Sequence, residues 1–213
     1  MGRSRSRAFL TVGGAVIAAG IGLAAMLTSA GASEGSPALA AGAMKVDAAH
    51  SVVVYKIKHM KASHHYGMFA GPTGSFTIDA ADPSKCALDV TVKVDSLNSG
   101  NAKRDQHLKT PDFFSAKEFP TIAFKSKSFT KGEGSSYTVA GDLTLHGVTK
   151  PVTAVLAVTG TNSTPKGEVV GVEATFAIKR TDFGMKSFVD NGMLGDDVSL
   201  VVALEGNNLP EEK

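Results

Sequence analysis

The chain of 213 residues is long enough for one large domain and does not require a second. Its formal net charge of +2 depends on Arg3, Arg5 and Arg7, because removing these three from the 22 basic residues leaves 19 against 20 acidic residues. A near-neutral domain without a basic stripe is a poor candidate for binding nucleic acid or anionic membrane surfaces, and a single cysteine, Cys86, excludes an internal disulfide.

The amino end has the pattern of an export signal. The three arginines precede a run without charged residues at 8–32, and small-x-small cleavage signals lie at 30–32 and 38–40. We expect residues 1–40 to be a signal peptide with its leader. An uncleaved anchor stays open, because an uncharged run of about 25 residues is long enough to span a bilayer. Either way the arginines stay in the cytoplasm, so we expect the domain in the periplasm, secreted, or anchored outside the cytoplasmic membrane.

Period-two alternation of apolar and polar residues dominates the rest of the chain. Leu88, Val90 and Val92, for example, alternate with Asp89 and Thr91. This alternation predicts strands with one apolar and one polar face, which is typical of an antiparallel sheet with water on one side. We expect eight strands around residues 53–57, 74–78, 88–94, 122–127, 137–145, 152–158, 170–178 and 198–204, with turn signals such as Asp82-Pro83 and His146-Gly147 between them.

Good helix formers are concentrated only at 99–110, in the long connection between the third and fourth expected strands. A short helix is therefore expected in this connection. Eight antiparallel strands bury their apolar faces and remove their edges by closing, so the expected fold is all-β, an eight-stranded antiparallel barrel with a short helical connection. A barrel of this size either fills itself with side chains or encloses one small ligand. Tryptophan is absent and Val, Ile and Leu dominate the inward faces, which favours an underfilled interior.

Four ordered blocks of residues give the chain a resemblance to a known family. They include Asp47 with His50-Ser51, then Asp112-Phe113-Phe114, the stretch 141–152, and Arg180 with Asp182-Phe183-Gly184. In these blocks the chain resembles the YceI-like polyisoprenoid-binding proteins over residues 46–206, which leaves 207–213 as a polar tail. The resemblance implies a lipocalin-like barrel, export to the periplasm, and a long amphiphile in an apolar channel.

The expected ligand contacts combine inward strand positions with polar residues near the helical connection. They are Tyr55, Ile57, His59, Val90, Val92, Arg104, Asp105, His107, Ile122, Phe124, Leu143, Leu145, Leu156, Phe176, Ile178, Phe183, Leu200 and Val202. Two roles stay open for Arg104, Asp105 and His107: contact with a ligand head group, or a buried ion pair that fixes the helix. Arg180 and Asp182 are expected to form a structural pair at a strand end.

Catalytic and metal chemistry have weak support in the sequence. The six histidines show no zinc-ligand spacing, the domain at 46–206 contains no Gly-x-Ser-x-Gly motif, and Cys86 has no flanking signature. We therefore expect no catalytic residue, metal site or cofactor.

The expected function is that of an exported binding protein that holds a polyisoprenoid, quinone or fatty-acid amide for transport, storage or sequestration. A ligand-free scaffold barrel and, less favoured, a histidine-based metal-binding or hydrolytic protein are the alternatives. The expected partner is a long-chain apolar lipid, with no nucleic acid, and with membrane contact only through an uncleaved amino end. Pairing of two chains to a homodimer stays open.

Overall fold

The computed structural model describes residues 42–208. The expectations for residues 1–40 and for the end of the polar tail lie outside the described residues. Among the residues described, no helix combines the length and apolar character needed to cross a membrane.

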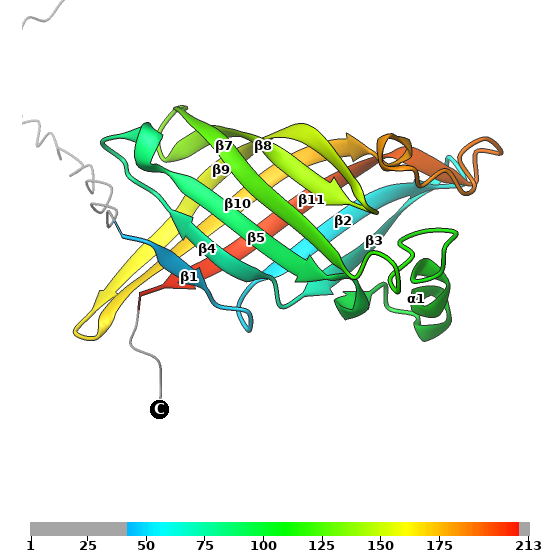
Figure 1. The fold of residues 1–213 in the computed structure, drawn as a ribbon, viewed down its shortest axis with the longest axis horizontal. Helices are drawn as coiled ribbons and strands as arrows, with labels where there is room; N and C mark the ends of the chain where they lie inside the picture. Colours follow the sequence, from blue (N-terminus) through cyan, green and yellow to red (C-terminus); the bar gives the residue numbers. More distant parts are fainter. Residues whose placement is uncertain (1–41, 209–213) are drawn as a thin grey trace, which may run out of the picture. The chain divides into compact units, whose positions relative to one another are not determined.

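The described chain forms one antiparallel sheet that closes on itself (Figure 1). Its sheet order is β1-β4-β5-β7-β8-β9-β10-β11-β2-β3-β6, and an additional β1–β11 pairing closes the ring. The strands are β1 (Met44–Val46), β2 (Val52–His59), β3 (Ser63–Ala70), β4 (Thr73–Thr77), β5 (Ala87–Lys93), β6 (Leu97–Asn98), β7 (Thr121–Lys131), β8 (Ser136–Leu145), β9 (Val148–Thr164), β10 (Gly167–Lys179) and β11 (Leu194–Asn207).

The strands occupy eight positions around the barrel because three of the positions are interrupted. β1 and β2 follow one another along the same edge of β11. In the next position β3 pairs with β2 and β4 pairs with β1, and the break between them lies at Gly71-Pro72, where Gly71 has a φ of 65°. β5 and β6 share the third interrupted position. The predicted eight-stranded antiparallel barrel is confirmed.

The strand β3 was not among the expected strands. Its residues pair with the whole of β2, from Val52↔Ala70 to His59↔Ser63, but its inward positions His65 and Gly67 break the apolar alternation. Gly67 is required by a close approach, because a Cβ atom at this position would lie 2.3 Å from the hydroxyl oxygen of Tyr55. The Tyr55 ring thus fills space that a side chain of β3 would otherwise occupy.

The expected helix forms at residues Ala102–Leu108 (α1), where the side chain of Asn101 caps it by accepting a hydrogen bond from Arg104 N at 3.0 Å. Three short 3₁₀ helices occur at Pro83–Lys85 (η1), Val94–Ser96 (η2) and Arg180–Phe183 (η3). Figure 1 shows α1 and the turns that precede β11 at one end of the barrel, and β1 toward the other.

The end of the barrel near β1 is filled by a packed core. Met44, Phe76 and Tyr137 are each 1% exposed, and Val139 is fully buried against them. The Tyr137 ring also contacts the Phe129 ring edge-to-face at 6.1 Å. The barrel is therefore plugged at this end, and any internal space lies toward α1.

Candidate functional site

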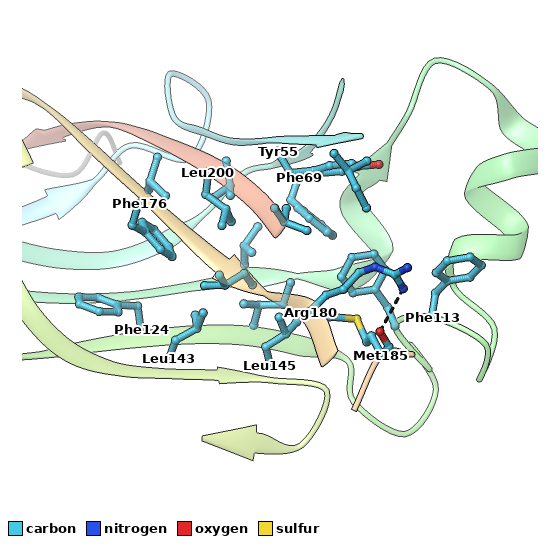
Figure 2. Close-up of a pocket in the computed structure, with 18 of the residues that line it drawn as sticks. Tyr55, Phe69, Phe113, Phe124, Leu143, Leu145, Phe176, Arg180, Met185 and Leu200 are labelled. Carbon is cyan, nitrogen blue, oxygen red and sulfur yellow. Dashed lines mark hydrogen bonds between the residues drawn. The ribbon is translucent and has the colours of Figure 1, made fainter. Parts of the chain in front are cut away.

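A cavity of about 370 Å³ lies inside the barrel (Figure 2). This volume falls in the range of roughly 300–1,000 Å³ that is typical of small-molecule sites. Most of its wall is apolar, and Phe124, Leu143, Leu145, Phe176 and Leu200 all line it. They belong to four different strands, and their inward side chains together enclose one apolar space.

The structure brings most of the predicted contacts together in this wall. The cavity is lined by Tyr55, Ile57, His59, Val90, Val92, Arg104, His107, Ile122, Phe124, Leu143, Leu145, Leu156, Phe176, Ile178, Leu200 and Val202. Asp105 and Phe183 do not line it.

Several lining residues were missed by the sequence reasoning. His65 and Phe69 come from β3, which was not predicted as a strand. Phe113 follows α1, and Phe188 and Met193 lie in the loop between η3 and β11. No periodic signal marks residues in such loops, and in β3 the inward positions His65 and Gly67 interrupt the apolar alternation that would have marked a strand.

The cavity opens at the end that α1 covers. The lining residues that are exposed to solvent are His59, Arg104, His107, Phe188 and Met193, and all lie at strand ends or in connections on this side. Aromatic contacts join two of these connections, since the Phe113 ring stacks on the Phe188 ring at 6.0 Å. We call this opening the mouth.

Arg104 and Asp105 are both tied to Ser99 rather than to each other. The Asp105 carboxylate accepts hydrogen bonds from the backbone N and the hydroxyl of Ser99. Arg104 donates from Nε to the Ser99 hydroxyl at 2.8 Å and from Nη2 to the Ser99 carbonyl at 2.7 Å. Asp105 therefore anchors the helix through Ser99 and not through the buried ion pair that was one of the two expected roles, while Arg104 also reaches the cavity wall.

Replacement of Ser99 by alanine is expected to raise the pKa of Asp105. The hydroxyl of Ser99 is the main cause that holds this pKa below its usual value, with the Ser99 backbone N–H as a smaller one. A carboxyl-carbon NMR titration of the Ser99→Ala protein measures the change. Ser96→Ala is the matched control, because its hydroxyl bonds only to the Lys93 carbonyl, and an unchanged Asp105 pKa in Ser99→Ala would contradict the assignment.

Phe183 is buried beside the cavity, behind its wall. Its side chain is 2% exposed and packs with Leu145, Ile178 and Met185. Its carbonyl oxygen accepts a hydrogen bond from His146 Nδ1 at 3.0 Å. Phe183 thus anchors η3 to the hairpin between β8 and β9, and acts on the cavity only through its neighbours.

Arg180 is a buried cation in the cavity wall. It is 4% exposed and donates hydrogen bonds to three backbone carbonyls, from Nε to Gly195, from Nη1 to Met185 and from Nη2 to Ser187, at 2.8, 3.0 and 2.8 Å. No carboxylate of the described chain lies in salt-bridge distance of it, so the expected Arg180–Asp182 pair was wrong. Burial lowers the pKa of Arg180, but a guanidinium stays charged in proteins.

Two further polar groups face the cavity near the mouth. Burial raises the pKa of Tyr55 to about 12, which keeps its phenol protonated. Burial, followed by the charges of Arg104 and His59, lowers the pKa of His65, and its Nε2 atom is buried without a hydrogen-bond partner in the described structure. These neutral groups stand beside Arg104, so the mouth offers hydrogen bonds and positive charge to a polar group inside it.

One cluster of potential metal ligands occurs among residues 42–208, outside the cavity. The ligand atoms of Asp47, His50 and Glu205 lie within 4.8 Å of one another. A 3.0 Å contact between Asp47 Oδ2 and His50 Nδ1 lowers the pKa of Asp47 and raises that of His50. The His50 side chain is largely exposed, so the group forms a surface ion pair at the β1–β2 junction.

Comparison with known proteins agrees with this architecture. Residues 44–206 match the YceI-like domain family. A UPF0312 protein of Serratia proteamaculans (strain 568) is 38% identical over 190 residues, which cover 88% of this chain and 94% of the relative. The crystal structure of the Campylobacter jejuni YCEI protein is 32% identical, covers 74% of this chain and 91% of its own, and superposes with a TM-score of 0.64.

A more distant solved structure shares the fold. It is a polyisoprenoid binding domain from Saccharophagus degradans implicated in plant cell wall breakdown, 16% identical, with a TM-score of 0.60 over 78% of this chain and 98% of its own. The match of the family model to nearly all the described residues, with the Serratia relative, decides the assignment. The chain belongs to the YceI-like domain family.

Proposed function

We propose that the protein is an exported, non-catalytic binding protein that holds one long apolar amphiphile in its barrel. The observation that carries this proposal is the cavity itself, which has an apolar wall, a packed plug at one end and polar groups gathered at the mouth. Such a space accepts a chain tail-first and leaves its polar end near Tyr55, His65 and Arg104.

The energetics of the cavity favour a long alkyl or isoprenoid chain. Each buried methylene contributes roughly 0.8 kcal/mol, so tight binding needs few polar contacts. The name of the Saccharophagus degradans domain supports a polyisoprenoid as the ligand class, and a quinone or fatty-acid amide offers a similar tail. The three groups named at the mouth suit a head group that accepts hydrogen bonds.

Two features support a non-catalytic, exported role. The described residues that line the cavity include no serine, threonine, cysteine, lysine or carboxylate, which leaves the enclosed space without the usual nucleophiles and carboxylate bases. Export is supported by the arginines and the uncharged run of the amino end.

Amino-terminal sequencing of protein from a periplasmic fraction should find that the mature chain starts after residue 32 or 40. Protein found only in the cytoplasm, with its original amino terminus intact, would contradict export.

Native mass spectrometry of protein purified without detergent is expected to show one bound lipid for each chain. Organic extraction of the same sample should release a species whose mass matches a polyprenyl, quinone or fatty-amide compound. A protein that carries no lipid, and that takes up none of these compounds when they are added, would refute the proposal and favour the ligand-free scaffold.

A further inference from the structure

Exposed apolar side chains gather around the mouth. Met60, Phe188 and Met193 are 59%, 38% and 43% exposed, and we call them the rim patch. They lie on two adjacent turns, because Met60 N donates to the Met193 carbonyl at 2.8 Å and Leu194 N donates to the Phe188 carbonyl at 3.0 Å. None of the large exposed hydrophobic residues lies on the turns 131–136 and 165–166 at the opposite end.

The rim patch is continuous with the interior of the barrel. Phe188 and Met193 are exposed to solvent and also line the cavity. An apolar surface therefore runs from the cavity wall through the mouth to the outside. A soluble protein that exposes such a surface beside a binding site commonly uses it for an interaction.

The backbone presents two of these residues at a conformational cost. Met60 and Phe188 have φ angles of 50° and 63°, and Lys61 next to Met60 has 56°. Glycine and asparagine adopt this left-handed region readily, whereas bulky side chains avoid it. Glycine or asparagine would adopt these backbone angles with less strain. The turns instead carry large apolar side chains that are exposed to solvent.

The two turns that carry the rim patch have a net positive charge, and Asp196 and Asp197, which directly follow the second turn, pair with Lys179. The segments 58–63 and 185–195 contain Lys58, Lys61 and Lys186 against one carboxylate, Asp190. No ion pair within 4.0 Å engages these three lysines in the described structure. The near-neutral charge of the whole domain argued against anionic membranes, but the fold concentrates unpaired lysines beside the exposed apolar residues.

From this arrangement we propose that the rim patch docks the mouth of the barrel onto an anionic lipid bilayer. The proposal rests on the proposed function, because a long apolar ligand reaches the cavity from a membrane. Met60, Phe188 and Met193 enter the interface between head groups and acyl chains, and the lysines meet anionic head groups, as in other interfacial anchors. The ligand then passes between bilayer and cavity without crossing water.

A single tryptophan introduced at the rim tests the docking, because the chain contains none. Met60→Trp is the reporter, since Met60 is not part of the cavity wall. Val155→Trp is the matched control, because Val155 is 55% exposed on β9. Both variants are made in the full chain, so any effect of the amino end is common to both.

With vesicles of phosphatidylethanolamine and phosphatidylglycerol that carry brominated acyl chains, the emission of Met60→Trp should shift to the blue. Its quenching should exceed that of Val155→Trp several-fold, and vesicles of phosphatidylcholine alone should give less. Equal quenching of the two variants, or none at Met60→Trp, would overturn the docking proposal.

The lysines are tested in the Met60→Trp chain by adding Lys61→Glu and Lys186→Glu. Losing two lysines is expected to weaken vesicle binding by at least about 25-fold, about fivefold for each, while Lys166→Glu at the opposite end should leave it unchanged. Equal effects of the two sets of changes would refute the proposed orientation.

Native mass spectrometry of the same variants separates this proposal from the proposed function. Retained lipid without rim quenching refutes docking alone. An empty cavity that also ignores added lipid refutes the binding function, whatever the rim tryptophan reports.

Discussion

Replacement of Arg180 by methionine is expected to destabilise the domain by about 3–5 kcal/mol, because three carbonyl groups lose their charged donor at once. These carbonyls belong to Met185, Ser187 and Gly195, so the change also releases the loop that forms one side of the mouth. Urea unfolding followed by circular dichroism measures the loss. Figure 2 shows the guanidinium of Arg180 beside Met185 at this side of the cavity.

Two further variants define the Arg180 experiment. Lys179→Met removes a neighbouring cation that is exposed and pairs with Asp197 at the surface, and it should change the stability much less than Arg180→Met, because exposed ion pairs contribute little. Arg180→Lys should lose an intermediate amount, because one ammonium group cannot reproduce the geometry of a guanidinium that serves three acceptors. An Arg180→Met protein as stable as Lys179→Met would show that the carbonyls find other donors.

Replacement of Phe124 by aspartate is expected to abolish lipid retention. Phe124 lines the cavity from β7, and its ring is close to Gly141 of β8. A carboxylate at this position would lie against an alkyl chain, while the buried cation Arg180 already serves three carbonyls, and an unpaired charge in apolar surroundings costs several kcal/mol. Native mass spectrometry of the purified variant measures retained lipid.

Matched variants distinguish lost binding from lost folding. Lys125→Asp changes the neighbouring outward position and should keep its lipid. Phe124→Leu should fold and bind with an altered preference for chain length, because an apolar replacement in a channel is tolerated better than in a packed core. Thermal melting of lipid-free and lipid-loaded forms provides the second readout. A folded Phe124→Asp protein that still carries lipid would remove Phe124 from the binding surface.

The inward faces of most strands were predictable from the sequence. Alternation at Val90, Val92, Leu143 and Leu145 decides which side chains face the same way, because successive residues of a strand point to opposite faces. The strand β3 escaped this reasoning, since its inward Gly67 makes room for the ring of Tyr55 on the neighbouring strand. A local pattern does not contain that requirement.

The polar part of the site was predicted only in part. The sequence placed Arg104 and His107 near one end of the barrel, and both line the cavity. It paired Arg180 with a carboxylate close in the chain, but the structure gives Arg180 three carbonyls at residues 185–195. Which carbonyl groups of an irregular loop accept hydrogen bonds depends on the path of its backbone. The identities of neighbouring residues do not predict that path.

The all-β class, eight of the strands, the helical connection and the family were predictable, because alternation, turn residues and motif spacing are properties of neighbouring residues. The packing of the closed barrel shows which end is plugged and which is open. It also decided that Phe113 and Phe188, 75 residues apart in the sequence, stack at the mouth. Closure and stagger of the strands bring distant connections together, and these contacts depend on the whole barrel rather than on any one segment.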